Sequence, residues 1–516
     1  MPNYLSPGVY VEEAVGGARP IEGVGTAVAA FVGLCDAGPF NTPTLVTYWT
    51  QFTNVFGTFS EGNYLHHSVY GYFQNGGGAA YIVRIGGDGA GSTPAAKAEL
   101  TATAGGGGGA GANVGALRVQ ALAEGTEGND ISVEIADTTT EGAPEDAFKL
   151  IVKKGNNVEE TFDNVTTKRG RQNVVTVVNA QSKLIRLEDL GVSPEKVSRG
   201  TVSLSGGGVP APVHLAPDDY VGDPSDRTGF GGLESVDEVT MVSVPDLMSA
   251  YQNRMIDLEG VQAVQLAMIA HCELMGDRVA ILDPPPGLNA QQIKEWRVDK
   301  VGYDSKYATL YWPWVKVFDP ASGTNIFVPP SGHMAGVWSR NDDTRGVHKA
   351  PANEVVRGAI TLEINITKNE HDLLNPVGIN CIRAFPGRGI RVWGARTLSS
   401  DAAWRYLNVR RFFNYLEESI LGGTDWVVFE PNDHDLWSKI RRTISAFLVN
   451  EWRKGALFGL TPAEAYYVKC DEETNPAEGI DAGQVICEIG VAPVKPAEFV
   501  IFRLSQYSGG TSLVTE

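Results

Sequence analysis

Hydrophobic and polar positions follow helix and strand periods in alternation between residues 23 and 86. An almost continuous apolar run at 26–35 predicts a strand that is buried on both faces. Apolar residues at helical spacing predict helices at 48–56 and 64–75, and the glycines at 76–78 end the second helix. A second apolar run at 81–85 predicts another strand. The order strand, helix, helix, strand is typical of an α/β layer.

Residues 87–237 have a different pattern. They contain no tryptophan, and turn residues separate short alternating runs at 117–121, 131–135 and 148–153. Alternation with a period of two predicts half-buried strands. We therefore expect a small β domain, a sandwich or a barrel, inserted into the α/β layer.

The α/β pattern resumes near residue 231, and large side chains become common, since nine of the ten tryptophans follow residue 290. The expected elements, in chain order, are a strand at 239–244, a helix at 256–273, a strand at 279–282, a helix at 291–301 and a strand at 308–312.

Two long amphipathic helices are predicted at 404–421 and 433–454, with Asn432 as the N-cap of the second. A charged helix face is usually only solvated, but the second helix is the best candidate in this chain for docking an acidic partner. Its basic residues are Lys439, Arg441, Arg442, Arg453 and Lys454.

The two ends of the chain have extended rather than helical patterns. Residues 1–22 contain a Pro-Gly turn and a short apolar run, and residues 497–503 form a strongly apolar β pattern. An apolar strand this close to a terminus needs a partner sheet, because an unpaired one promotes aggregation.

The net charge of −19 argues against general binding of nucleic acid, which requires a basic surface. Only residues 330–460 are locally basic, with 17 basic and 14 acidic residues against 22 and 38 in residues 1–329. The five cysteines are widely spaced, which favours a reducing compartment without disulfides or zinc. With no secretory signal and no apolar stretch near ~20 residues, we expect synthesis in the cytoplasm and no membrane insertion.

Sequence motifs for enzyme chemistry are weak. A GxGxxG pattern at 106–111 lies in a glycine run and follows no predicted strand, so we expect no nucleotide cofactor. Residues 271–273 (HCE) are neighbours along a helix and do not face one another. Residues 332–336 and 509–512 faintly resemble the histidine and serine motifs of subtilisin-type proteases, but the serine lies near the chain end without a following helix.

The remaining polar residues do not favour a catalytic or metal site either. The eight histidines contain no HExxH motif and no Cys/His cluster, so no metal is expected. Asp283, Asp342 and Asp343 are interpreted as loop carboxylates with capping or turn roles. We therefore predict no catalytic residue and a protein that is not an enzyme, with a decorated α/β hydrolase as the rival hypothesis.

Eight blocks of this chain resemble contractile phage tail sheath proteins, a family that includes the sheaths of R-type pyocins and extracellular contractile injection systems. The similar blocks fall within 1–86 and 230–505, and together they are specific. They are LSPGVYVEE (5–13), NGGGAAYIVR (75–84), VPPSGHMAG (328–336), RGVHKAPAN (345–353), LNPVGIN (374–380), FPGRGIRVWGARTLS (385–399), WRYLNVRR (404–411) and FEPN (429–432).

The resemblance implies an α/β (α+β) fold whose α/β core is subtilisin-like but lacks a protease site. It also implies that the inserted region is the most variable part, and one modest insert is more similar to phage-derived injection systems than to long-tailed phages. The expected domains are a linking arm (1–22), a discontinuous α/β core (23–87 and 216–355), an inserted β domain (88–215), a C-terminal α+β domain (356–497) and a C-terminal strand and arm (498–516).

The function implied is that of a structural subunit that polymerises helically around an inner tube and contracts from a metastable extended state. A non-contractile tube or capsid protein is the alternative. Expected partners are copies of the chain, in rings that are expected to be six-fold, the inner tube, a baseplate and a terminator or cap. The phage tail or tail-like particle would be released by lysis.

In a helical lattice of this kind, contacts between subunits must not close on themselves. We expect each terminal segment to add a strand to a sheet of a neighbouring subunit, and the basic helix face to contact the inner tube. The predicted inter-subunit residues are Tyr4, Val9, Tyr10, Val11 and Glu12 in the first segment, and Phe499, Val500, Ile501, Phe502 and Arg503 in the second.

Overall fold

The computed structural model describes residues 20–503, except 36, 61, 87–94, 104–112, 125–128, 141, 156, 169, 190–198 and 206–214. The chain divides into two compact units. Met1–Ile85 with Ala216–Glu516 form the first, and Gly86–Leu215 form the second.

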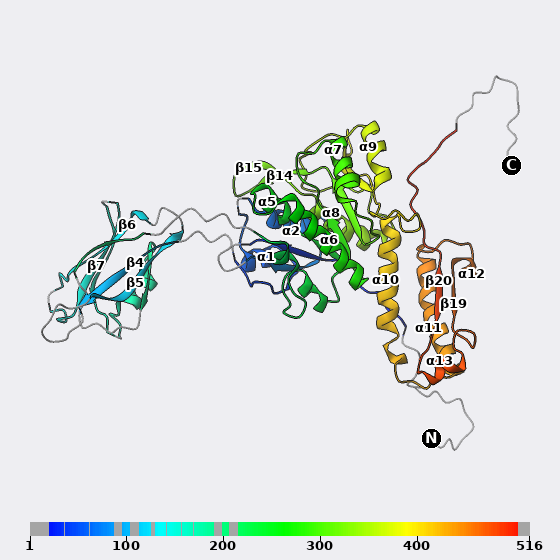
Figure 1. Cartoon of the computed structure of the whole chain (residues 1–516), viewed down its shortest axis with the longest axis horizontal. Coiled ribbons are helices and arrows are strands. Elements are labelled where there is room, and N and C mark those ends of the chain that lie inside the picture. Colours follow the sequence, from blue (N-terminus) through cyan, green and yellow to red (C-terminus); the bar gives the residue numbers. More distant parts are fainter. Residues whose placement is uncertain are drawn as a thin grey trace, which may run out of the picture. The chain divides into compact units, whose positions relative to one another are not determined.

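An eight-stranded sheet organises the first unit (Figure 1). Its six central strands are parallel, and the strand at each edge is antiparallel to its neighbour. Parallel strands of this kind are buried on both faces, which explains their continuous apolar sequences. In spatial order the strands are β18 (Gly389–Val392), β17 (Ile379–Phe385), β13 (Ala308–Trp312), β12 (Val279–Leu282), β11 (Met241–Ser243), β1 (Val28–Gly33), β3 (Ala79–Arg84) and β2 (Thr44–Val46).

Helices and a small sheet accompany these strands. The small sheet has the order β15 (Thr324–Val328), β14 (Val315–Asp319) and β16 (Thr361–Leu362). The helices are α1 (Trp49–Phe56), α2 (Leu65–Asn75), α4 (Pro217–Val221), α5 (Asp246–Gln252), α6 (Leu258–Met275), α7 (Ala290–Glu295), α8 (Ser331–Arg345) and α9 (Lys368–Leu374). A π-helical turn at Trp296–Val301 follows α7.

Helix α8 was not predicted, because it is buried on nearly all sides and therefore has no polar stripe. Its glycines allow close packing on α2: a Cβ at Gly336 would lie 2.4 Å from the Tyr72 carbonyl oxygen. Asp342 and Asp343 lie in this helix, so the prediction that they are loop carboxylates was wrong. Asp342 forms a buried ion pair with Arg411 at 2.6 Å and accepts a hydrogen bond from Thr26 Oγ1.

The C-terminal part of the first unit is built on two long helices and a two-stranded sheet. Helices α10 (Leu407–Gly423) and α11 (His434–Arg453) share an apolar core with β19 (Tyr466–Lys469) and β20 (Glu488–Val491). Short helices α12 (Pro462–Ala465) and α13 (Ala477–Asp481) lie between the long helices and β20 in the sequence. Figure 1 shows β19 and β20 beside α11.

The predicted cap of α11 was wrong by one residue. Asp433 is the N-cap, and its side chain accepts a hydrogen bond from the Leu436 amide. Asn432 instead donates to the Gln484 carbonyl and accepts from Trp437 Nε1, so it ties the start of the helix to a distant loop.

The second unit contains two antiparallel sheets around one apolar core. One sheet has the order β10 (Gly200–Ser203), β6 (Ile131–Asp137), β7 (Phe148–Lys154) and β8 (Asn157–Val165). The other has the order β4 (Ala95–Thr103), β5 (Asn113–Glu124) and β9 (Ile185–Asp189), and helix α3 (Val174–Gln181) adds to the same core. The predicted mixed α/β class of the chain is confirmed.

Candidate assembly surfaces

The C-terminal segment changes from anchored to exposed within a few residues. The Phe458 amide donates to the Ala492 carbonyl, and the Val494 amide donates to the Ala456 carbonyl. After Glu498 the described chain forms no strand, and the next four side chains are 67–84% exposed: Phe499, Val500, Ile501 and Phe502. Arg503 is also exposed. Figure 1 shows this segment leaving the body of the first unit.

A run of four exposed apolar side chains is costly in water, about 1.5–3 kcal/mol for each side chain that could be buried. The segment therefore has the properties of a strand that awaits a partner sheet. The predicted contact residues of the N-terminal segment, Tyr4 to Glu12, lie outside the described residues.

The two-stranded sheet β19–β20 is an available acceptor for such a strand. It is antiparallel, and within the described part of the chain each of its strands pairs with the other alone, which leaves one edge of each open. One face packs on the core that includes α11, through Tyr466, Val468, Ile489 and Val491. Tyr467 points the other way and is 60% exposed. The alternation of apolar and other positions at 488–491 (EIGV) is the signal by which the sequence could have revealed one strand of this sheet.

The five predicted basic residues of α11 do not form one surface. Lys439, Arg442 and Arg453 are exposed and recur at helical spacing, together with the exposed Ala446 and Asn450. We call these three the basic stripe. Within the described residues none of the three forms an ion pair, so their charges are available to a partner.

The other two basic residues form contacts with other residues of the same chain. Arg441 lies on the opposite side of the helix, where its guanidinium donates to the Cys470 carbonyl and to Ser438 Oγ. Lys454 pairs with Glu451 at 2.7 Å. The i,i+3 spacing of Glu451 and Lys454 could have revealed the second contact, whereas the Cys470 carbonyl that binds Arg441 is placed there only by the fold.

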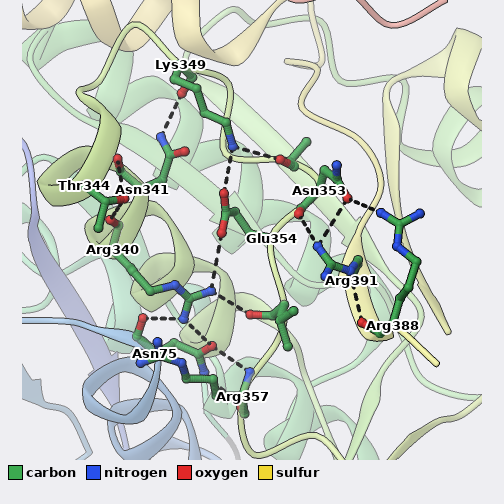
Figure 2. Close-up of polar contacts among 12 residues, drawn as sticks. Asn75, Arg340, Asn341, Thr344, Lys349, Asn353, Glu354, Arg357, Arg388 and Arg391 are labelled. Carbon is green, nitrogen blue, oxygen red and sulfur yellow. Dashed lines mark hydrogen bonds and ion pairs between the residues drawn. The ribbon is translucent and has the colours of Figure 1, made fainter. Parts of the chain in front are cut away.

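A strap of residues 349–357 ties α2, α8 and the β17–β18 hairpin together (Figure 2). Arg340 donates to the Asn75 carbonyl at 2.7 Å and to the Val355 carbonyl at 2.6 Å. Asn353 has a positive φ of 59°, and its carbonyl accepts from Arg391 at 2.7 Å. Lys349 pairs with Glu354 at 2.8 Å. These bonds join the strap to α2, to α8 and to the hairpin.

The described part of the faint protease resemblance, residues 332–336, lies buried in α8. Ser331 Oγ donates to Asp283 at 2.5 Å and accepts from Ser243, all three are buried, and none of these bonds involves a histidine. His333 is buried against α2, and burial lowers its pKa to about 4. Asp283 is likewise buried, which raises the pKa of its carboxyl group to about 7. A serine whose hydroxyl group is buried and bound in this way is inaccessible to a substrate.

The HCE sequence at 271–273 is structural as well. Burial lowers the pKa of His271 to about 4, raises the pKa of the Cys272 thiol well above its usual range, and leaves that thiol inert. Glu273 accepts a hydrogen bond from Ser305.

The glycine run at 106–111 and residues 509–512 lie outside the described residues. Among the residues that the structure describes, no group of His, Cys, Asp and Glu could hold a metal ion. No helix in the same part of the chain is long and apolar enough to cross a membrane.

Two family models match the chain, one directly after the other. Residues 237–398 match the phage tail sheath protein central domain, and residues 399–506 match the phage tail sheath C-terminal domain. Together they cover more than half of the chain. The chain belongs to the phage tail sheath family.

Curated relatives of this sheath-family chain include the tail sheath protein of Vibrio phage KVP40, which is 28% identical over 43% of this chain and 36% of the relative. A putative prophage major tail sheath protein of Pseudomonas aeruginosa is 27% identical over 47% of this chain and 61% of the relative. The aligned region thus spans about a third to three fifths of these curated relatives.

Solved sheath structures share the fold over nearly the whole length. The sheath complex of the extracellular contractile injection system PVC, in its contracted state, is similar over 98% of this chain and 99% of that chain, with a TM-score of 0.59 and 23% identity. The helical sheath of the anti-feeding prophage, also contracted, is similar over 97% and 99%, with the same TM-score and identity.

Proposed function

We propose that this protein is the subunit of a contractile sheath, which polymerises helically around an inner tube and contracts from a metastable extended state. The observation that carries the proposal is the pair of tail sheath domains over residues 237–506. The exposed apolar segment after Glu498 is a physical reason for this chain to assemble with a neighbour.

Strand addition provides the link between subunits in this proposal. The C-terminal segment of one subunit pairs with an open edge of β19–β20 in the next, and the N-terminal segment pairs in the same way. Each backbone hydrogen bond contributes about 0.5–1.5 kcal/mol net, and the lattice repeats them in every subunit. Links made of single added strands let subunits rotate and slide while they stay linked. A barrier sets the lifetime of the extended state.

The inner tube is the partner that we assign to the basic stripe. The three cations of the stripe form no ion pair with any described residue, and together they favour an acidic partner surface, mainly through association rate and register. Release of the tube during contraction then breaks exposed charge contacts, which are individually weak, about 0–1 kcal/mol each.

The assembled particle is a phage tail or a phage tail-like particle, made in the bacterial cytoplasm and able to leave by lysis. Rings of six subunits, a baseplate and a terminator complete it. The nearly full-length fold similarity to sheaths of extracellular contractile injection systems favours that class of particle over a long-tailed phage.

Negative-stain electron microscopy of the purified full chain tests the proposal. Hollow, ridged cylinders wide enough to surround a tube are expected. A monodisperse monomer or a small closed oligomer over a range of salt concentrations contradicts the proposal.

A further inference from the structure

One ion pair lies at the point where the C-terminal segment becomes exposed. Arg396 donates to both carboxylate oxygens of Glu498, from Nε at 2.9 Å and from a terminal nitrogen at 2.5 Å. Its side chain is 9% exposed and that of Glu498 is 16% exposed. A two-pronged arginine–carboxylate contact with so little solvent fixes direction as well as distance.

Arg396 is itself held by the central sheet. Its amide donates to Asn380 Oδ1 at 2.7 Å, and its carbonyl accepts from Asn380 Nδ2 at 2.8 Å and from Thr309 Oγ1 at 3.0 Å. Asn380 belongs to β17 and Thr309 to β13. A continuous series of polar contacts therefore runs from the C-terminal segment into the eight-stranded sheet.

A second tie lies a few residues earlier. Asn408, in the first turn of α10, donates to the Val494 carbonyl at 3.0 Å and to the His348 carbonyl at 2.7 Å. The chain from Val494 to Glu498 is thus attached to the helix, to the neighbourhood of the strap and to the sheet. The four apolar residues that follow are exposed.

We propose that the Arg396–Glu498 pair is the anchor of the C-terminal segment: it transmits the pull of a neighbouring subunit to the central sheet and confines bending to the residues after Glu498. The proposal rests on the function proposed above. It makes Arg396 and Glu498 positioning residues for assembly and contraction. Neither side chain needs to touch the neighbour.

Without the anchor, the segment retains its apolar side chains, but its direction relative to the first unit is no longer fixed. A strand that already lies in the binding direction loses less conformational entropy when it pairs. Loss of the anchor therefore weakens polymerisation. It also lets the segment pull away from the body when subunits rotate, and contraction then separates subunits.

Glu498→Gln is the sharpest test, because it removes the charge and keeps the size. The matched control is Glu188→Gln, which removes one carboxylate from an exposed ion pair with Arg118 in the second unit, where no assembly surface is proposed. Circular dichroism and thermal unfolding report folding, pelleting reports the critical concentration for polymers, and electron microscopy reports sheath length before and after contraction.

The expected result for Glu498→Gln is a folded subunit whose critical concentration rises about tenfold, the scale set by loss of one charge-assisted contact, and contracted sheaths that break into short pieces. Arg396→Lys, which keeps the charge but loses the fork, gives a similar defect. The control assembles and contracts as the wild type does. Normal polymers and intact contracted sheaths from Glu498→Gln overturn the anchor alone, whereas failure of the wild type to polymerise overturns the proposed function.

Discussion

If the C-terminal segment adds a strand to β19–β20, the sensitivity of assembly to substitution must alternate along that segment. Successive side chains of a strand point to opposite faces. The acceptor sheet packs one face on the core that includes α11 and leaves Tyr467 exposed on the other. An added strand should therefore bury one of its faces and leave the other in water.

The segment itself indicates which face is buried. Arg503 shares a face with Phe499 and Ile501, whereas Val500 and Phe502 form a face without a charged residue after the anchor. Because an apolar core excludes an unpaired charge, we expect Val500 and Phe502 to point inward. The charged face remains at the surface of the neighbour.

The magnitude follows from exposure. Phe502 is 84% exposed in the single chain, and full burial of a phenylalanine contributes about 1.5–3 kcal/mol, so Phe502→Ala should cost about 2 kcal/mol per contact. At 1.4 kcal/mol per factor of ten, the critical concentration for polymerisation rises about 30-fold. Phe499→Ala is the matched control: the same substitution at a residue that is 73% exposed, on the opposite face.

Pelleting of polymers over a series of subunit concentrations measures the critical concentration of each variant. The expected outcome is a large shift for Phe502→Ala and a shift of less than about threefold for Phe499→Ala, within the scatter of exposed positions. Equal shifts for the two variants, or no shift for either, would refute strand addition. A shift for Phe499→Ala alone would reverse the assigned face.

Three further predictions follow from the described residues. Asp342→Asn leaves a buried arginine without its partner and should lower the free energy of unfolding by about 3–5 kcal/mol in denaturant titrations, whereas Glu473→Gln should change it by less than about 1 kcal/mol. Thermal stability should fall as pH decreases from 6.5 toward 4. Burial lowers the pKa of three histidines to about 4 in the folded chain, namely His67, His271 and His333. Between pH 6.5 and 4 the unfolded chain therefore takes up protons that the folded chain does not accept. The raised pKa of Asp283 opposes this trend for one proton, so Asp283→Asn should steepen it. Reversal of the basic stripe by Lys439→Glu with Arg442→Glu should weaken co-assembly with a tube protein and leave contracted polymers intact.

The stripe needs a control of equal charge. Lys183→Glu with Arg186→Glu makes the same reversal at two exposed residues of the second unit and should leave tube binding unchanged. Unchanged co-assembly after reversal of the stripe removes the tube assignment.

Stability that is constant between pH 6.5 and 4, or that rises on acidification, contradicts the lowered pKa values of the buried histidines.

Local patterns predicted individual elements well where one face of an element meets water. The helices expected at 404–421 and 433–454 correspond to α10 and α11, because their apolar stripes pack on a core and their polar faces are solvated. Helix α8 escaped prediction for the opposite reason, since burial on all sides removes the periodic signal.

Partnerships between distant residues could not be predicted from the sequence. Arg441 and Arg442 are adjacent in the chain, but only the fold places a carbonyl from the loop after β19 against the first. In the same way, nothing local connects Arg396 with Glu498, or Asp342 with Arg411. The positive charge of the region could be predicted from the sequence, whereas the contact that engages Arg441 depends on tertiary structure.

The most direct test of the contractile sheath is a comparison of two lattices by cryo-electron microscopy, after co-expression of this chain with its tube protein. We expect an extended sheath around the tube and, after mild destabilisation, a shorter and wider sheath in which the same terminal segments still link the same neighbours. A single lattice that disassembles without a second packing would contradict contraction and identify a static tube.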